Sequence, residues 1–225
     1  MHFRMTERHR MKPMTDPTPA NPRRFAIKTI AAYAMWTGSG VTFGSIFGCT
    51  PQQPAFVSVD VTGANYAREF ELTDQYGQTR RLTDFAGKVV VMFFGYTQCP
   101  DVCPTTLSEM AEVKKALGPD GERLQVLFVS VDPERDTPEL LKNYMVNFDP
   151  TFLALYAPLP KLAELAKDFK IYYKKVEGKS PSSYTMDHSA GSYVYDTKGQ
   201  LRLFTRYGSG PKGLTEDIRI LLKQA

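Results

Sequence analysis

Two cysteines at a strand-to-helix junction most limit what this chain can fold into. The run Val89 to Phe94 is continuously apolar, which is typical of a central strand buried on both faces. Cys99 and Cys103 follow it, and Thr105 to Leu117 has the spacing of an amphipathic helix. Backbone N–H groups at a helix start favour thiolate, which exchanges disulfides and binds soft metals. The sequence therefore predicts a chemically active thiol pair at the start of a helix.

The spacing of the cysteines leaves two chemistries open. Three residues separate Cys99 from Cys103, one more than in the usual redox pair. If both open the helix, their sulfurs lie at positions i and i+4, close enough to share a metal ion or form a disulfide. Pro100 and Pro104 stiffen the backbone and remove N–H donors. Disulfide exchange and soft-metal binding both fit this pattern.

The order of the other elements predicts an α/β, thioredoxin-like fold. Leu124 to Val131 indicates a second buried strand, and Thr137 and Pro138 suit the N-cap and first turn of a helix. A parallel strand–helix–strand unit followed by an antiparallel pair gives a mixed central sheet flanked by helices. The remaining elements are expected as an N-terminal hairpin extension around 74–78, a strand at 152–156, a helix at 160–170, a strand at 171–173, a polar loop at 177–187, a hairpin of 192–196 with 201–205, and a closing helix at 214–222.

The N-terminal region indicates targeting rather than folded structure. Residues 1–22 are polar and proline-rich, and we expect a disordered tail. Residues 23–50 begin with two arginines and continue as an uncharged, weakly apolar stretch, which is typical of a signal peptide or membrane anchor. Ile46-Phe47-Gly48-Cys49 resembles the lipobox of bacterial lipoproteins, so Cys49 is a lipidation candidate. A buried helix with a core cysteine is the alternative.

These features predict how the chain is organised. Residues 51–59 are expected to be a tether, and residues 60–225 a folded domain outside the cytoplasm, at the periplasmic side of a bacterial cytoplasmic membrane. The net charge of +4 is small and dispersed, which argues against nucleic acid as a partner. Three cysteines in 225 residues do not form a disulfide framework.

A histidine late in the domain offers a third soft-metal donor. His2 and His9 lie in the tail, whereas His188 ends the polar loop before a strand. In a thioredoxin-like topology this loop can return to the edge that carries the cysteines. Two thiolates and one imidazole form a three-coordinate site suited to Cu(I) and adaptable to Cu(II). An ordinary surface or core histidine is the alternative.

Three segments carry a family resemblance: Phe93 to Pro104, Val131 to Pro138, and Asp187 to Ser189. Residues 60–225 thereby resemble the Sco/SenC family of copper-binding, thioredoxin-like proteins that serve cytochrome c oxidase assembly. The resemblance implies that Cys99, Cys103 and His188 bind copper, and that the chain delivers it to the copper-A centre of the oxidase. We expect the two cysteines to form a disulfide when oxidised. The expected partners are the copper-accepting oxidase subunit, a thioredoxin-like reductant, and the membrane at the N-terminus.

Two questions stay open at this level. Asp132 and Arg135 are candidates for shaping the electrostatics of the site, although a turn and a helix cap explain their loop equally well. A thiol–disulfide oxidoreductase or a thiol peroxidase is the alternative function. The peroxidase alternative is weaker, because Pro100 and Tyr96 stand where peroxiredoxins have Thr or Ser and Pro. We expect a metallochaperone rather than an enzyme, with the same thiol pair reducing the acceptor's disulfide before copper loading.

Overall fold

The structure is a computed structural model that describes residues 55–179 and 183–224. The chain divides into two units, residues 1–50 and 51–225, and every described residue belongs to the second. The predicted tail, the signal or anchor region and the lipidation of Cys49 lie outside the described residues. Across 55–179 and 183–224, no helix combines the length and apolar character needed to span a membrane.

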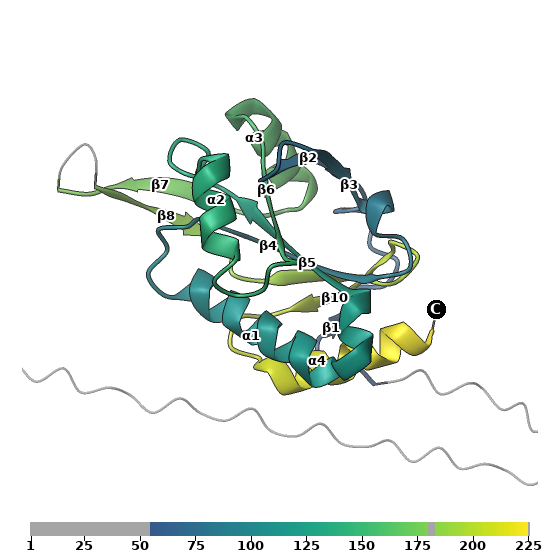
Figure 1. Cartoon of the computed structure of the whole chain (residues 1–225). Coiled ribbons are helices and arrows are strands. Elements are labelled where there is room, and N and C mark those ends of the chain that lie inside the picture. The colour runs from purple at the N-terminus through teal and green to yellow at the C-terminus, as the bar shows by residue number, and fades with distance from the viewer. Residues whose placement is uncertain (1–54, 180–182, 225) are drawn as a thin grey trace, which may run out of the picture. The chain divides into compact units, whose positions relative to one another are not determined.

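A mixed sheet forms the centre of the described unit (Figure 1). Among the described residues it has eight strands in the order β1-β10-β9-β4-β5-β6-β2-β3. The central strands β4, β5 and β6 run parallel, and the other neighbouring pairs are antiparallel. The strands are β1 (Val59–Asp60), β2 (Glu71–Asp74), β3 (Thr79–Arg81), β4 (Val89–Gly95), β5 (Leu124–Ser130), β6 (Leu153–Tyr156), β9 (Ser192–Tyr195) and β10 (Leu201–Thr205).

Helices cover both faces of this sheet, which explains why β4 is apolar throughout. Val89, Val91 and Phe93 pack into one hydrophobic cluster with α1 and α4, whereas the alternate residues of β4 pack into a second cluster with α3. Figure 1 shows α1 and α4 together below the sheet and α3 above it. The helices are α1 (Val102–Leu117), α2 (Pro138–Met145), α3 (Leu159–Asp168) and α4 (Pro211–Lys223), with short 3₁₀ turns η1 (Leu82–Phe85) and η2 (Gly118–Arg123).

Most predicted elements are confirmed. The hairpins β2–β3 and β9–β10 form as expected, the first at the edge of the main sheet. Helix α2 begins at Pro138, and the Thr137 hydroxyl accepts a hydrogen bond from the Leu140 N–H at 3.2 Å, which confirms the predicted cap. The parallel β4–α1–β5 unit places the strand-to-helix junction at the carboxyl end of β4.

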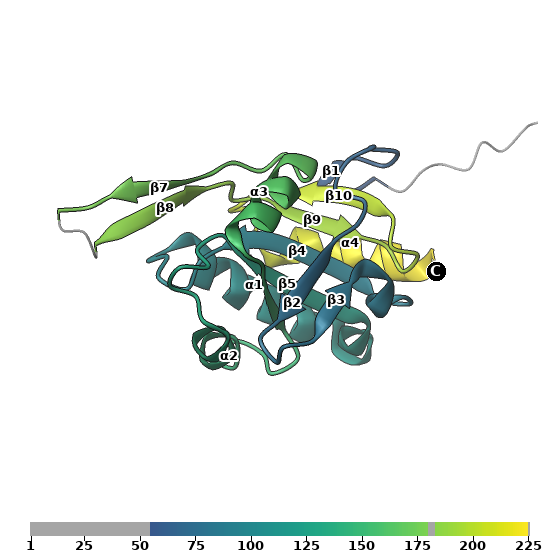
Figure 2. The same cartoon turned by 90° about the horizontal axis from the view of Figure 1, so that it is seen from above.

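The predicted polar loop at 177–187 is wrong. Strands β7 (Tyr173–Glu177) and β8 (Tyr184–His188) form a separate two-stranded antiparallel sheet. This β7–β8 hairpin extends away from the main sheet (Figure 2). Most of its described residues are exposed and only Met186 among them is buried, so the alternation of apolar and polar residues that marks a strand is missing. Without this alternation the sequence also misplaces the start of β7: the strand was expected at 171–173, and it spans Tyr173–Glu177.

The described fold begins before residue 60. The backbone N–H groups of Val57 and Ser58 donate to the two carboxylate oxygens of Asp217 on α4, each at 2.8 Å. Strand β1 then pairs with β10. Val57, Ser58 and Val59, which the composition assigns to a tether, are therefore fixed on the folded domain.

Asp217→Ala should destabilise the domain, because both N–H groups would lose a charged acceptor that is fully buried. We expect the free energy of unfolding to fall by about 2 kcal/mol. Urea denaturation measures this, with Glu216→Ala as an exposed control on the same helix. An unchanged urea midpoint would contradict the role of Asp217 as an anchor for the N-terminal strand.

Candidate metal centre

The cysteine loop joins β4 to α1. Cys99 lies before the helix, where its N–H donates to the Tyr96 carbonyl at 3.2 Å, and Cys103 lies in the first turn of α1. Only Cys103 therefore belongs to the helix, although the two sulfurs still lie close together, as the spacing predicts. A residue before proline avoids the helical region, so Pro100 keeps Cys99 outside the helix, whereas the first turn tolerates Pro104.

The two sulfurs differ in their surroundings. Cys103 is fully buried, Cys99 is partly exposed, and both are free thiols. Cys103 lies so close to the end of β4 that a Cβ added to Gly95 would come within 2.5 Å of its Sγ. Burial raises the pKa of the Cys103 thiol, and a hydrogen bond from the Tyr96 backbone only partly offsets this. For Cys103, burial thus outweighs the thiolate-favouring effect expected at a helix start.

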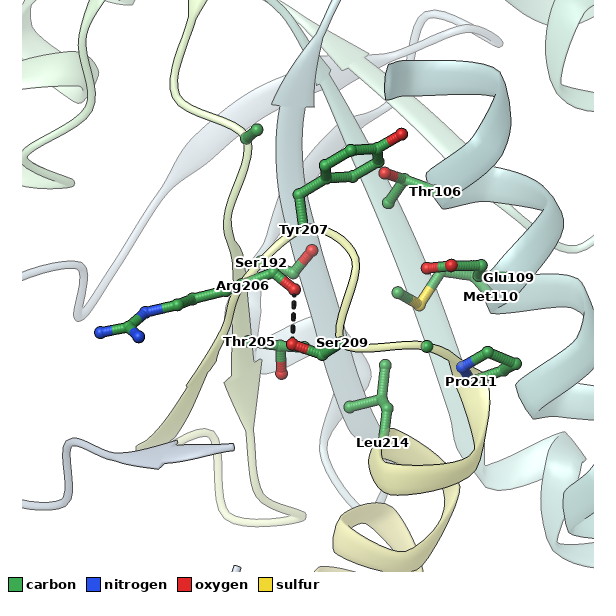
Figure 3. A pocket seen from close by; sticks show the side chains of 12 residues that line it. Thr106, Glu109, Met110, Ser192, Thr205, Arg206, Tyr207, Ser209, Pro211 and Leu214 are labelled. Atoms are coloured by element: carbon green, nitrogen blue, oxygen red, sulfur yellow. Dashed lines mark hydrogen bonds between the residues drawn. The ribbon is translucent and has the colours of Figure 1, made fainter. Parts of the chain in front are cut away.

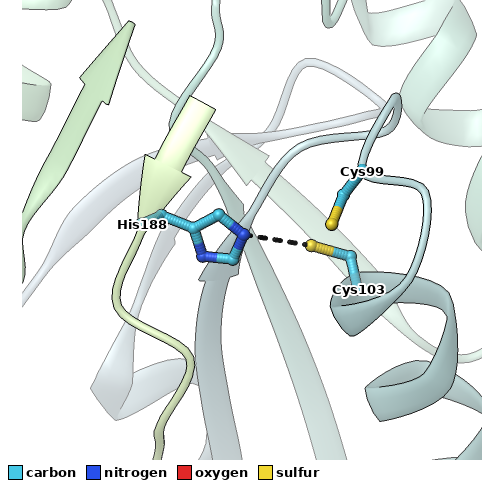
Figure 4. Close-up of side chains that lie close together, drawn as sticks. All are labelled: Cys99, Cys103 and His188. Carbon is cyan, nitrogen blue, oxygen red and sulfur yellow. Dashed lines mark hydrogen bonds between the residues drawn. The ribbon is translucent and has the colours of Figure 1, made fainter. Parts of the chain in front are cut away.

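His188 reaches the cysteines from the β7–β8 hairpin. It ends β8, and its Nε2 lies 3.6 Å from the Cys103 Sγ (Figure 4). Its Nδ1 lies 3.1 Å from the Ser189 carbonyl oxygen, which can only accept, so Nδ1 carries the hydrogen in this contact. In the neutral imidazole this leaves the lone pair of Nε2 facing the sulfurs, the arrangement that a metal-binding histidine needs.

The predicted trio is brought together. The Sγ atoms of Cys99 and Cys103 and a ring nitrogen of His188 all lie within 4.8 Å of one another. Bonds from first-row metals to nitrogen and sulfur are about 2.0–2.3 Å long, so small side-chain adjustments bring all three donors onto one ion. Two thiols and one imidazole are a soft donor set, and this chemistry fits copper better than a hard cation such as Mg²⁺.

Asp132 and Arg135 lie beside the trio and do not belong to it. Asp132 is buried and pairs with Arg135, whose Nε lies 2.5 Å from a carboxylate oxygen. Arg135 also donates to the side chain of Gln98, the residue before Cys99, at 3.0 Å. The loop after β5 therefore contacts the cysteine loop directly, in addition to capping α2.

Asp136 is a supporting residue that sequence reasoning missed. Its buried carboxylate accepts hydrogen bonds from the Thr97 hydroxyl and the Ser130 hydroxyl, both at 2.6 Å, and from the Thr97 N–H. Burial raises the pKa of Asp136, and these hydrogen bonds oppose the rise. Asp136 precedes the Thr137 cap, so its sequence context indicates a turn and gives no sign of the contact with Thr97.

A cavity next to the site is small. It lies between α1 and the segment from β10 to α4, and its lining includes Thr106 on α1 and Ala190 just after His188 (Figure 3). The Ser209 hydroxyl donates to the Arg206 carbonyl at 2.8 Å and closes the turn on one side. The cavity volume of about 10 Å³ has room for about one water molecule. An organic substrate does not fit there.

Comparisons with known proteins agree with this geometry. The family model described as SCO1/SenC matches residues 53–223. The chain is 31% identical to the SCO2-like protein of Rickettsia conorii over 196 residues, which cover 86% of this chain and 96% of that protein.

Solved structures of copper-bound proteins are similar as well. Copper-bound ScoI of Bradyrhizobium japonicum is 40% identical, with a TM-score of 0.63, covering 68% of this chain and 97% of that chain. Copper-bound yeast Sco1 is 30% identical, with a TM-score of 0.64, covering 70% of this chain and 88% of that chain. These structural neighbours hold copper, and the cluster of Cys99, Cys103 and His188 offers donors that copper can use.

Proposed function

The chain belongs to the SCO1/SenC family, and we propose that it is a membrane-tethered copper metallochaperone for cytochrome c oxidase. In this proposal Cys99, Cys103 and His188 bind copper as cargo, and the chain delivers it to the copper-A centre of the oxidase. The observation that carries the proposal is the convergence of two sulfurs and one imidazole nitrogen within 4.8 Å. Residues 23–50 hold the domain at the outer side of the bacterial cytoplasmic membrane.

The surroundings of the donors suit a carrier that must also release its cargo. Thiolates are strong ligands for Cu(I), and imidazole extends the donor set toward Cu(II). Cys103 is enclosed by the end of β4 and the start of α1, whereas Cys99 is partly exposed. An acceptor protein therefore meets Cys99 first, and its own thiols can replace the ligands of the copper one at a time.

A reductive step belongs to the same proposal. An acceptor that holds its two cysteines as a disulfide cannot take up copper until they are reduced, because copper loading needs free thiolates. The metal-free Cys99 and Cys103 thiols can attack that disulfide through a mixed disulfide. The Cys99–Cys103 pair is thereby oxidised to its own disulfide. The acceptor's disulfide takes up the two electrons and two protons and becomes two thiols. A thioredoxin-like reductant then restores the pair.

A thiol–disulfide oxidoreductase is the second candidate function. It is favoured by one observation, that both thiols are free and lie close enough to react as a pair. Catalytic turnover of a protein disulfide by the metal-free domain would favour this enzyme function. It would leave the proximity of His188 to the sulfurs without a role.

Copper titration of the reduced domain, residues 51–225, tests the proposed function. We expect one Cu(I) per chain, and X-ray absorption should report both sulfur and nitrogen ligands. Cys99→Ser, Cys103→Ser and His188→Ala should each weaken copper binding by more than about tenfold, because each removes a direct ligand. Asp187→Ala, an exposed neighbour of His188, is the matched control and should bind like the parent. The three-ligand site is wrong if His188→Ala and Cys99→Ser both bind copper as tightly as the parent.

A further inference from the structure

The guanidinium group of Arg135 joins three segments around the candidate metal centre. Its Nη1 donates to the Gln98 side-chain oxygen at 3.0 Å and to the Tyr184 carbonyl oxygen at 2.9 Å. Its Nε donates to Asp132. Gln98 precedes Cys99 in the cysteine loop, and Tyr184 begins β8, the strand that ends at His188. One side chain therefore links the loop after β5 to the two segments that carry the sulfur and nitrogen donors.

Aromatic stacking continues this link to the imidazole. The guanidinium of Arg135 lies 3.5 Å from the ring centroid of Tyr184 and 5.7 Å from that of Tyr96. The Tyr96 ring in turn meets the His188 ring edge to face, with centroids 5.8 Å apart and planes at 87°. The Tyr184 hydroxyl donates to Asp132 at 2.8 Å. The contacts form a continuous path from the Asp132–Arg135 pair to His188.

Besides this link, the described part of the β7–β8 hairpin contacts the second hydrophobic cluster through Met186, Tyr173 and Tyr184. It belongs to a separate sheet, and of its described residues only Met186 is buried. An ion pair between Lys175 of β7 and Glu134 also joins the hairpin to the loop after β5, and both of its side chains are more than one-third exposed. An exposed pair of this kind adds little stability. The side chain of Arg135 is only 15% exposed. It contacts Tyr184, which pairs with Glu177 next to the hairpin turn, at the end of β8 opposite His188.

We propose that Arg135 is a positioning residue that holds β8, and through it the imidazole of His188, against the cysteine loop. The proposal deepens the proposed function, on which it rests for the role of His188 as a ligand. Arginine suits this task because its planar fork reaches several acceptors at once and stacks on aromatic rings. Lysine has the same charge but only a point-like ammonium group, so it cannot replace these contacts.

Two variants and one control test the proposal. Arg135→Ala removes the link, and Arg135→Lys keeps the positive charge but not the fork. Arg80→Ala is the matched control, because Arg80 also pairs with a fully buried carboxylate, Asp74, in the β2–β3 hairpin. Should Arg135→Ala fail to fold, Arg135→Lys carries the same measurements.

The first measurement uses the metal-free protein. Amide hydrogen exchange should become at least about tenfold faster in β8 of both Arg135 variants, while β4 and β5 keep the protection of the parent. Arg80→Ala should leave β8 unchanged. Parent-like exchange of β8 in Arg135→Ala would overturn the proposal, and so would full recovery in Arg135→Lys, which would make the role one of charge alone.

The second measurement uses the Cu(II)-loaded protein. Electron paramagnetic resonance should show nitrogen hyperfine coupling in the parent and in Arg80→Ala, and reduced coupling in both Arg135 variants. The optical charge-transfer absorption from sulfur to Cu(II) should be retained in all four proteins. Undiminished coupling in Arg135→Ala would also overturn the proposal. A parent without nitrogen coupling would instead contradict the ligand set of the proposed function. In that case, the exchange measurement still decides whether Arg135 holds the hairpin.

Discussion

Gly95→Ala should lower both the stability of the domain and its affinity for copper. The new Cβ would lie 2.5 Å from the Cys103 Sγ and 2.7 Å from the Phe128 ring, closer than non-bonded atoms can approach. Either the sulfur or the ring must move, and overpacking of this kind costs about 1–3 kcal/mol. Displacement of the sulfur also disturbs its distance to the Nε2 of His188. Urea denaturation and competition for Cu(I) against a chelator measure the two effects.

Gly213→Ala is the control that separates the effect of steric overpacking on stability from its effect on the metal centre. Its Cβ would lie 2.8 Å from the Val57 side chain, in a contact between α4 and the N-terminal segment that involves neither cysteine. We expect it to leave the affinity for Cu(I) at the parent value. If Gly95→Ala bound Cu(I) with parent affinity as well, the position of Cys103 would not depend on the small residue at the end of β4.

Asp136→Ala should cause a second large loss of stability. It leaves the Thr97 N–H, the Thr97 hydroxyl and the Ser130 hydroxyl without their buried acceptor. We expect the free energy of unfolding to fall by about 3 kcal/mol. The cysteine loop should loosen too, since Thr97 lies two residues before Cys99. Chemical denaturation and the rate of alkylation of Cys99 report these effects, and a parent-like alkylation rate would contradict the role of Asp136 in holding the loop.

Asp136→Asn tests the ionisation of the same group. Burial raises the pKa of Asp136 above its ordinary value of 3.8, so the folded protein holds this proton more tightly than the unfolded chain. Between 3.8 and the raised pKa, stability from this group therefore decreases as the pH rises. Asp136→Asn should remove that part of the pH dependence of the urea midpoint. An unchanged pH profile would show that Asp136 has no raised pKa in the folded protein.

Local sequence signals predicted the centre of the fold because each carried a physical signature. The apolar runs that became β4 and β5 are buried on both faces, and Thr137 caps α2 as its side chain allows. The trio of Cys99, Cys103 and His188 was found because sulfur and imidazole are rare and chemically distinct. Most of the helices and strands begin and end within a few residues of the bounds that the sequence predicts.

Features set by tertiary contacts could not be predicted in the same way. The β7–β8 hairpin lies largely outside the hydrophobic core, so its residues lack the apolar pattern on which strand prediction depends. The contacts of Asp136 with Thr97 and of Arg135 with Tyr184 join residues 39 and 49 positions apart. Only the pairing of elements brings such residues together, and the local sequence gives no sign of it.

The origin of the three donors has a thermodynamic consequence. The sulfurs come from the β4–α1 junction and the imidazole from a separate hairpin, so an ion bound to all three would crosslink two parts of the chain that the main sheet does not join. Cargo binding and docking of the hairpin would then be linked equilibria. Each must favour the other by the same factor, so whatever undocks the hairpin also promotes release of the cargo.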